Sequence, residues 1–225
     1  EEGARVVVGD INVENADRVA RQIGEAGGQA ISVQFDISDD ASVAALIAAA
    51  VETYGGLDLL HANAADLSIV FQDLDALTVP LEIFDRTIAV NLRGHLLCTR
   101  HALPALLKRG GGAIVYTSSA AAFLGEQEQV SYSVGKSGLN ALMRNVASRW
   151  GKQGIRANAL APGVVLTEMA AYLPEEIKRA YLERTRSPRL GTPADIAALV
   201  AFLASDDGAW INGQVLSIDG GLLLR

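Results

Sequence analysis

Two side chains four residues apart carry the clearest chemistry in the sequence. Tyr132 and Lys136 stand in the segment Tyr-Ser-Val-Gly-Lys, inside a stretch with a helical pattern at 130–150. Residues four apart share one face of a helix, so the Lys136 ammonium would lie near the Tyr132 phenol. A neighbouring positive charge stabilises a phenolate and lowers its pKa from the usual value of about 10. The pair therefore predicts a general acid/base for a carbonyl oxygen, although a Tyr-Lys pair alone is more often an ordinary surface pair.

Two polar residues upstream extend this chemistry. Ser119 follows the run 113–117, where a strand is expected to end, and precedes Tyr132 by thirteen residues. Its hydroxyl could hydrogen-bond a substrate oxygen and polarise it. Asn91 lies inside a long helical stretch although Asn is a poor helix former. A buried Asn needs hydrogen-bond partners, so we expect Asn91 to hold a backbone bend or to order a water beside Lys136. Taken singly, these residues would be a loop serine and a packing residue.

The elements that must position these side chains alternate between strand and helix. Short β-branched or apolar runs predict strands, and apolar residues at helical spacing predict helices. The expected strands are 5–10, 29–35, 57–62, 113–117, 155–161 and 214–218. The expected helices are 14–26, 39–54, 80–108, 130–150 and 193–204, with a variable region at 164–190.

This alternation determines the expected fold. It predicts parallel strands joined by right-handed helical crossovers, with helices on both faces of the sheet. The expected fold class is therefore α/β, a three-layer Rossmann-type doubly wound parallel sheet. No linker, repeat or low-complexity tract is found, so we expect a single domain over 1–225. Such sheets bind ligands beyond the carboxyl ends of their strands.

The composition excludes several other classes of protein. The chain has 225 residues, half of them hydrophobic, and a net charge of −7. An acidic surface repels phosphate backbones, so no nucleic acid is expected as a partner. Cys98 is the single cysteine and no metal-ligand spacing is present, so we expect no metal site and a cytoplasmic location. No apolar run approaches the roughly 20 residues that span a bilayer, and no membrane partner is expected.

The polar residues and their neighbours together resemble the classical short-chain dehydrogenases/reductases. The resemblance rests on Ser118-Ser119, on the spacing to Tyr-x-x-x-Lys, and on Asn91 in a Val-Asn-Leu context. It continues through Arg156-Ala-Asn158, Ala161-Pro-Gly-Val-Val-Leu-Thr167 and Gly213-Gln-Val-Leu-Ser-Ile-Asp-Gly-Gly221. In that family a Ser, a Tyr, a Lys and an Asn form a catalytic tetrad. The resemblance implies these roles for Ser119, Tyr132, Lys136 and Asn91.

The expected strand ends also match the family's cofactor site. An acidic residue such as Asp10, at the end of a strand, accepts hydrogen bonds from the adenosine ribose and repels a 2′-phosphate. Asp10 therefore favours NAD over NADP. The third strand ends in Asn-Ala-Ala where the family has Asn-Ala-Gly, with Ala65 in place of glycine. The other cofactor contacts that the resemblance implies are Ile11, the adenine-contacting pair Asp36 and Ile37, Asn63, Ala64, Tyr132, Lys136, and the nicotinamide-binding stretch of Pro162, Gly163, Val165 and Thr167.

The resemblance implies an oxidoreductase that transfers a hydride between NAD(H) and a secondary alcohol or ketone, with Tyr132 as general acid/base. Within the family, a 3-oxoacyl-thioester (acyl-carrier-protein) reductase is an alternative. That group commonly uses NADP, and Asp10 argues against it. The alternative from another class is a cofactor-free, non-catalytic binding protein. The substrate would be a small molecule under a lid formed by 166–190, and the family implies a homo-oligomer, most simply a tetramer.

No Gly-rich phosphate loop is found in the sequence. A G-x-G-x-x-G turn normally precedes the acidic residue by roughly 20 residues, and that distance from Asp10 runs past Glu1. Gly110-Gly-Gly112 precedes a strand rather than following one. We therefore expect the first strand and the Gly-rich loop to lie outside the given chain. We also expect a gap between two halves of the sheet, and weak binding of NAD by residues 1–225 alone.

Overall fold

The computed structural model of the chain describes residues 2–171 and 173–224. Within these ranges the strands form two parallel sheets. The smaller sheet pairs β1 (Arg5–Asp10) with β2 (Gln29–Gln34). The larger has the order β3-β4-β5-β6, from β3 (Leu59–Ala62), β4 (Gly112–Thr117), β5 (Ile155–Pro162) and β6 (Val215–Ile218). The described strands confirm the predicted parallel α/β fold.

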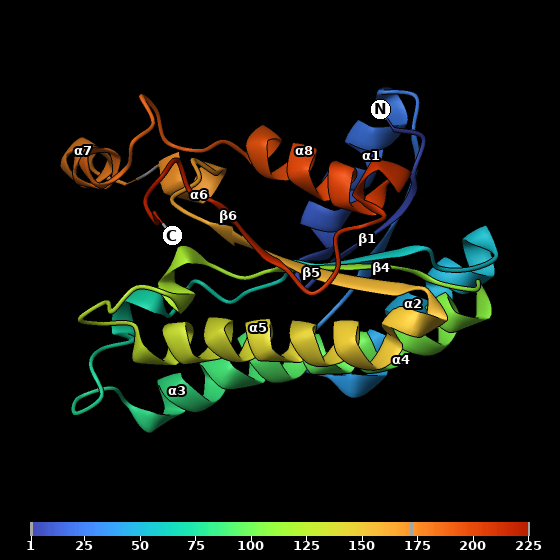
Figure 1. The fold of residues 1–225 in the computed structure, drawn as a ribbon, viewed down its shortest axis with the longest axis horizontal. Coiled ribbons are helices and arrows are strands. Elements are labelled where there is room, and N and C mark those ends of the chain that lie inside the picture. Colours follow the sequence, from blue (N-terminus) through green and yellow to red (C-terminus); the bar gives the residue numbers. More distant parts are fainter. Residues whose placement is uncertain (1, 172, 225) are drawn as a thin grey trace.

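Helices cover both faces of the strands, which gives three layers (Figure 1). α3, α4 and α5 lie on one face, and α1 and α8 lie on the other. The helix bounds are α1 (Val13–Glu25), α2 (Asp40–Tyr54), α3 (Leu81–Ile88), α4 (His95–Lys108), α5 (Val130–Trp150), α6 (Glu168–Ala171), α7 (Glu175–Arg184) and α8 (Pro193–Ala204). Shorter turns are η1 (Val70–Gln72), η2 (Ala89–Gly94), η3 (Ala120–Ala122), η4 (Gly151–Gln153) and η5 (Asp206–Gly208).

The core explains why the central strands are almost entirely apolar. Ile155, Ala157, Ala159 and Leu160 of β5 are all fully buried, because helices cover both faces of a parallel sheet. The larger apolar cluster lies on the side of α4 and α5 and includes residues of α2. A smaller cluster joins β4 and β5 to Leu203 of α8.

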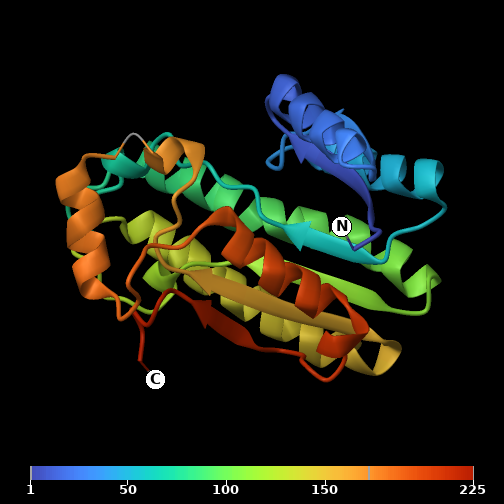
Figure 2. The same cartoon turned by 90° about the horizontal axis from the view of Figure 1, so that it is seen from above.

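The two sheets are separate, as expected from the sequence. In the described ranges β1 is hydrogen-bonded only to β2, and β3 only to β4. Figure 2 shows β1 and α1 set to one side of the four-stranded sheet. Contacts of α2 with both β1 and α4 connect the two parts.

The predicted helix at 80–108 is not one regular helix. It consists of α3 and α4 joined by η2, a short π-helical segment. Asn91 lies within η2, where the regular α-helical hydrogen bonding is interrupted, and its proposed hold on a backbone bend stays a prediction. π-Helical segments of this kind occur often at functional sites. The variable region at 164–190 contains the short helices α6 and α7.

Candidate active site

The first turns of α5 carry Tyr132 and Lys136 to the carboxyl end of β4. The Lys136 side chain is 1 % exposed, and its Nζ donates a 2.7 Å hydrogen bond to the Thr117 carbonyl at the end of that strand. The Ser118 hydroxyl donates to the Lys136 carbonyl at 3.2 Å. Burial lowers the pKa of Lys136 to about 8. The lysine is therefore a desolvated ammonium, held by backbone next to Tyr132.

Tyr132 and Ser119 form the polar end of this arrangement. The two side chains are hydrogen-bonded, and the Ser119 Oγ also accepts from the Ala121 amide at 3.1 Å. The Ser119 hydroxyl is therefore held between the Ala121 amide and the Tyr132 phenol. Lys136 Nζ lies 5.6 Å from the centre of the Tyr132 ring. These side chains meet as their motif spacing predicts.

The expected lowering of the tyrosine pKa is wrong for this geometry. Burial raises the pKa of Tyr132, and the hydrogen bond with Ser119 only partly opposes that effect. The reason is where Lys136 points: its ammonium binds the Thr117 carbonyl and faces the ring of Tyr132. The four-residue spacing predicts that Tyr132 and Lys136 lie side by side on the helix, but it does not predict which of their atoms are in contact.

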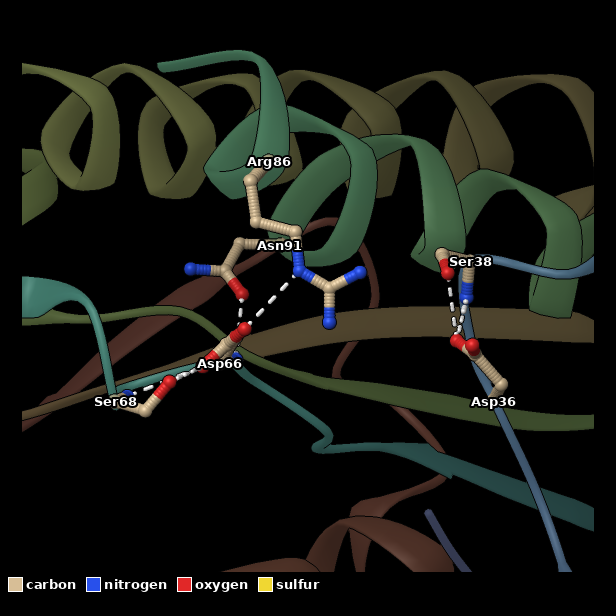
Figure 3. Close-up of polar contacts among 6 residues, drawn as sticks. All are labelled: Asp36, Ser38, Asp66, Ser68, Arg86 and Asn91. Atoms are coloured by element: carbon tan, nitrogen blue, oxygen red, sulfur yellow. Dashed lines mark hydrogen bonds and ion pairs between the residues drawn. The ribbon is translucent and has the colours of Figure 1, made fainter. Parts of the chain in front are cut away.

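Asn91 connects the π-helical segment to the loop after β3. The residue is fully buried, and its Oδ1 accepts a 3.1 Å hydrogen bond from the Asp66 amide. Its Nδ2 has no partner among the described residues. Figure 3 shows Asn91 and Arg86 both directed at Asp66. The loop of Asn63 and Ala64, a proposed cofactor contact, is thus held in place by the side chain of Asn91.

Two acidic side chains in the loops after β2 and β3 lie on either side of Arg86 (Figure 3). Arg86 Nε binds the Asp66 carboxylate at 3.1 Å. Burial alone would raise the pKa of Asp66, but hydrogen bonds from Ser68 and Arg86 lower it overall. Asp36, at the end of β2, binds the amide and hydroxyl of Ser38, and these bonds lower its pKa, with a smaller contribution from Arg86. Both carboxylates are therefore firmly ionised.

The remaining predicted cofactor residues also follow strand ends. One Asp10 oxygen accepts from the Asn12 amide at 2.8 Å, and Ile11 is 59 % exposed. Asp36 and Ile37 follow β2, while Asn63 and Ala64 follow β3. Pro162 and Gly163 stand at the end of β5. Beyond them, Val165 bridges to Gly191, and Thr167 Oγ1 accepts from the Ala170 amide at 3.3 Å.

A cavity of about 420 Å³ opens beside Tyr132. Glu126 and Arg184 meet across its wall at 3.1 Å, which joins α7 to the loop after η3. Its lining residues are Ser119, Ala120, Ala121, Leu124, Glu126, Gln127, Glu128, Gln129, Tyr132, Pro162, Gly163, Val164, Tyr181, Arg184 and Leu222. The predicted catalytic pair Ser119 and Tyr132 therefore faces the same small-molecule-sized space as Pro162 and Gly163 of the predicted nicotinamide stretch, whereas Val165 and Thr167 do not line it.

Two buried polar residues of this region were missed by sequence reasoning. Asp73 caps the start of α5, and His95 binds the Ala64 carbonyl at 3.0 Å. The only available signal for Asp73 was indirect: residues 126–130 contain no Ser, Thr, Asp or Asn to cap the coming helix. Nothing in the local sequence distinguished His95 from a surface histidine.

The described residues contain neither a metal-ligand cluster nor a membrane-spanning helix. No group of three or more His, Cys, Asp or Glu is arranged to hold a metal ion. Among the helices seen in those same residues, none is long and apolar enough to cross a membrane.

Comparison with known proteins identifies the family. The sequence profile described as Enoyl-(Acyl carrier protein) reductase matches residues 1–223. A probable short-chain type dehydrogenase/reductase of Bradyrhizobium diazoefficiens is 44 % identical, over 99 % of this chain and 79 % of the relative. The cis-4-hydroxycyclohexanecarboxylate dehydrogenase of Sinomonas cyclohexanicum is 40 % identical, over 98 % of this chain and 87 % of the relative.

A solved structure agrees with both relatives. It is a 7α-hydroxysteroid dehydrogenase in complex with NADH and 7-oxoglycochenodeoxycholic acid, 33 % identical to this chain. It matches with a TM-score of 0.90 over 99 % of this chain and 87 % of its own. Fold, motifs and relatives agree, and the chain belongs to the classical short-chain dehydrogenase/reductase family of oxidoreductases.

Proposed function

We propose that the chain is an NAD-dependent dehydrogenase of secondary alcohols, with residues 1–225 acting as one dinucleotide-binding and catalytic domain. The observation that carries the proposal is the hydrogen-bonded pair Ser119 and Tyr132 at the wall of a small-molecule cavity, backed by the buried ammonium of Lys136. Relatives named as dehydrogenases of a hydroxycyclohexanecarboxylate and of a hydroxysteroid support a cyclic secondary alcohol as the substrate class.

The residues present fit a nicotinamide dinucleotide. Lys136 has three N–H donors and uses one on Thr117, so buried donors remain for ribose hydroxyls. Asp10 uses one carboxylate oxygen on Asn12, and the other can accept from the adenosine ribose. Asp36, Asn63, Ala64, Pro162, Gly163, Val165 and Thr167, with Ile11 and Ile37, would complete the contacts. When bound, the nicotinamide supplies the acceptor or donor of the hydride.

Residues of the chain transfer the proton to and from the substrate oxygen. When substrate is bound, Ser119 turns its hydroxyl proton from Tyr132 to the substrate oxygen and orients that oxygen. During reduction Tyr132 gives its phenol proton to the carbonyl oxygen of the substrate. During oxidation the phenol proton must first leave to solvent, and the phenolate that remains takes the proton of the alcohol. Lys136 provides positive charge beside the ring, which favours the phenolate once that proton has left. Asn91 keeps the loop after β3 in position through its bond to Asp66.

One experiment separates this function from its alternatives. The purified chain is titrated with NADH and NADPH by fluorescence, then assayed with cis-4-hydroxycyclohexanecarboxylate, a 7α-hydroxy bile salt and, in the reverse direction, an acetoacetyl thioester. NAD-linked oxidation of an alcohol is expected. Preference for NADPH and the thioester would favour the acyl-thioester reductase, for which the matching family profile is named. Because residues 1–225 alone are expected to bind NAD weakly, the titration extends to high nucleotide concentration. Binding of neither nucleotide there, together with no turnover, would favour the non-catalytic binding protein.

We also propose a homotetramer. The exposed apolar side chains of Leu96 on α4 and Val134 on α5 support an interface on this helical face, since exposed apolar surface often marks one. Light scattering at micromolar concentration tests it, and a monomer would contradict it.

A further inference from the structure

The helix that carries Tyr132 begins without a cap of its own. Gln129 occupies the position before Val130, and its side chain makes no capping hydrogen bond. Its backbone is left-handed, with φ 65 and ψ 42, a conformation that is unfavourable for a residue other than glycine. The first N–H groups of a helix have no partner within the helix. A buried helix start of this kind must find its acceptors elsewhere in the fold.

Asp73, 58 and 59 residues away in the chain, supplies those acceptors. One carboxylate oxygen accepts from the amide and the hydroxyl of Ser131, at 3.0 and 2.7 Å. The other accepts from the amide of Tyr132 itself, at 2.8 Å. The backbone carbonyls of Asp73 and Leu74 accept from Gln129 and Val130, at 2.8 and 3.3 Å. Every amide from 129 to 132 is thereby satisfied by a two-residue segment.

The carboxylate is chemically suited to this place. Asp73 is 2 % exposed, and each of its oxygens receives at least one hydrogen bond. A negative charge at a helix N-terminus is stabilised by the helix dipole. An ionised carboxylate is an acceptor on both oxygens, whereas an amide side chain would turn an NH₂ group toward one of the donors. The Asp73 carboxylate serves Ser131 and Tyr132 together, with one oxygen for each amide.

We infer that Asp73 is a positioning residue of the active site, which holds the backbone of Tyr132 so that its phenol meets Ser119 and stands against Lys136. The inference rests on the proposed role of Tyr132. It differs from ordinary helix capping because the capped amide belongs to the proton-transfer residue. Without this bond the first turn of α5 could fray, and the phenol would lose its fixed position relative to the cavity. A misplacement of about 1 Å can cost about 100-fold in rate.

The test compares Asp73→Asn with Asp75→Asn. Asp75 is the matched control, because it lies two residues away and also accepts from backbone amides, those of Leu77 and Thr78, but at an exposed turn. The primary measurement is the ultraviolet titration of the Tyr132 phenol, taken as the difference between each variant and the same variant with Tyr132→Phe. It needs neither cofactor nor substrate.

The expected result follows from the reason for the raised pKa. Burial raises the pKa of Tyr132, so a loosened first turn that admits water should lower that pKa in Asp73→Asn. The Asp75→Asn chain should titrate like the unmodified one. Ser131→Ala removes one partner of the carboxylate and leaves the bond to the Tyr132 amide, so it should also leave the titration unchanged. A folded Asp73→Asn chain with an unaltered Tyr132 titration would overturn the inference.

Two further measurements keep the test decisive. If Asp73→Asn does not fold, amide hydrogen exchange on the unmodified chain replaces it. Protection of the 131 and 132 amides equal to that of the interior of α5 is expected, and free exchange there would overturn the inference. Where the chain turns over an alcohol, Asp73→Asn should lower kcat about 100-fold with KM nearly unchanged. Absence of any turnover would count against the proposed function, while the titration would still decide the role of Asp73.

Discussion

At the scale of single residues, the site combines two groups whose burial favours their neutral forms. Burial lowers the pKa of Lys136 to about 8 and raises that of Tyr132. Both effects come from the same removal of water at the start of α5. Lys136 stays largely charged at neutral pH because its pKa of about 8 is still above 7, and its ammonium binds the Thr117 carbonyl. Tyr132 stays protonated beside Ser119. In the proposed reaction the neutral phenol of Tyr132 can donate a proton directly. It can act as a base only as a phenolate, which the nearby Lys136 ammonium would stabilise.

Tyr132→Phe should abolish turnover and leave the fold intact. The phenol is the one group proposed to exchange a proton with the reacting oxygen, and loss of general acid/base help costs about 100- to 10,000-fold. Steady-state rates and circular dichroism check the two parts. Tyr54→Phe is the matched control, since Tyr54 lies on α2 and its ring contacts Arg5. Retention of more than about a tenth of the rate would remove Tyr132 from its role.

His95 should make the fold sensitive to acid. It is fully buried, it donates Nε2–H to the Ala64 carbonyl, and burial, assisted by Lys136, lowers its pKa to about 3. The unfolded chain takes up a proton near the ordinary value of about 6.5, so stability is present above that pH and is lost as pH falls toward 3. Between pH 7 and pH 5 the loss from this residue should be about 2 kcal/mol.

Urea unfolding of the unmodified chain and of His95→Asn at both pH values measures this loss. The amide of Asn keeps a donor for the Ala64 carbonyl but does not titrate. The difference between the two chains should therefore shrink by about 2 kcal/mol on acidification. Equal acid sensitivity in both would show that His95 is not buried in its neutral form.

Sequence reasoning reached some of these residues and not others for a physical reason. Ser119, Tyr132 and Lys136 could be predicted because they lie close together in the sequence, one after a strand and two on the helix that follows. Asp73 and His95 act on partners 58 and 31 residues away, and only tertiary packing brings them there. The contact of Lys136 with the Thr117 carbonyl could not be predicted either, because every residue has a backbone carbonyl and the residue type does not show which one is bound.

At the scale of elements, the π-helical segment η2 links the predicted adenine site to the tetrad. Its last residue, Gly94, packs on the loop after β2. A Cβ there would lie 2.8 Å from the Ile37 carbonyl oxygen and 2.7 Å from the Ile37 Cγ1. Because one of these neighbours is backbone, the loop or the helix would have to move. The sequence predicted a helix across this region, but the π-helical turn depends on packing that periodicity does not report.

Gly94→Ala should therefore destabilise the chain and weaken NADH binding. Overpacking against a rigid neighbour costs about 1–3 kcal/mol, and the displaced loop carries the proposed contacts Asp36 and Ile37. Gly24→Ala is the control, because Gly24 lies in α1 with nothing within 4 Å of an added Cβ. That variant should gain up to about 1 kcal/mol from helix propensity. Thermal unfolding and NADH titration distinguish the two, and equal behaviour would contradict the proposed close contact.

The second element-level link is the ion pair between α7 and the loop after η3. Glu126 and Arg184 are about one third and one half exposed, so the pair should contribute at most about 1 kcal/mol. Arg184→Ala should raise KM by up to about fivefold, since it loosens the cavity wall. The effect should decline in high salt. Lys178→Ala removes a pair to Glu175 inside α7 and is the control. A salt-independent change in kcat would instead assign Arg184 a direct role in the reaction.

At the scale of the whole molecule, the described strands belong to two hydrogen-bonded units. The unit of β1, α1 and β2 meets the four-stranded sheet mainly through α2 and its contacts with α4. The proposed cofactor contacts are divided between the units: Asp10 and Asp36 on one, Asn63 and Pro162 on the other. A dinucleotide bound by all four would hold the units together. The sequence predicted the separation, because the Gly-rich loop and the central first strand of this fold are not found in residues 1–225.

This division predicts that the unit of β1 and β2 opens at a lower free energy than the four-stranded sheet. Bound NADH should reduce the difference between the two opening free energies. Amides of β1 and β2 should exchange hydrogen at least about tenfold faster than those of β4 and β5, because opening the smaller unit leaves the larger core intact. At about 100 times its Kd, NADH should stabilise the closed form by about 2.7 kcal/mol and slow exchange in β1 and β2 by up to about 100-fold.

Exchange in β5 serves as the internal control, since its residues are buried in the larger sheet. Mass-resolved exchange with and without NADH measures both effects. Uniform protection without ligand would contradict the division into two units. Protection by NADH confined to β3–β6 would show that Asp10 and Asp36 do not hold the adenosine.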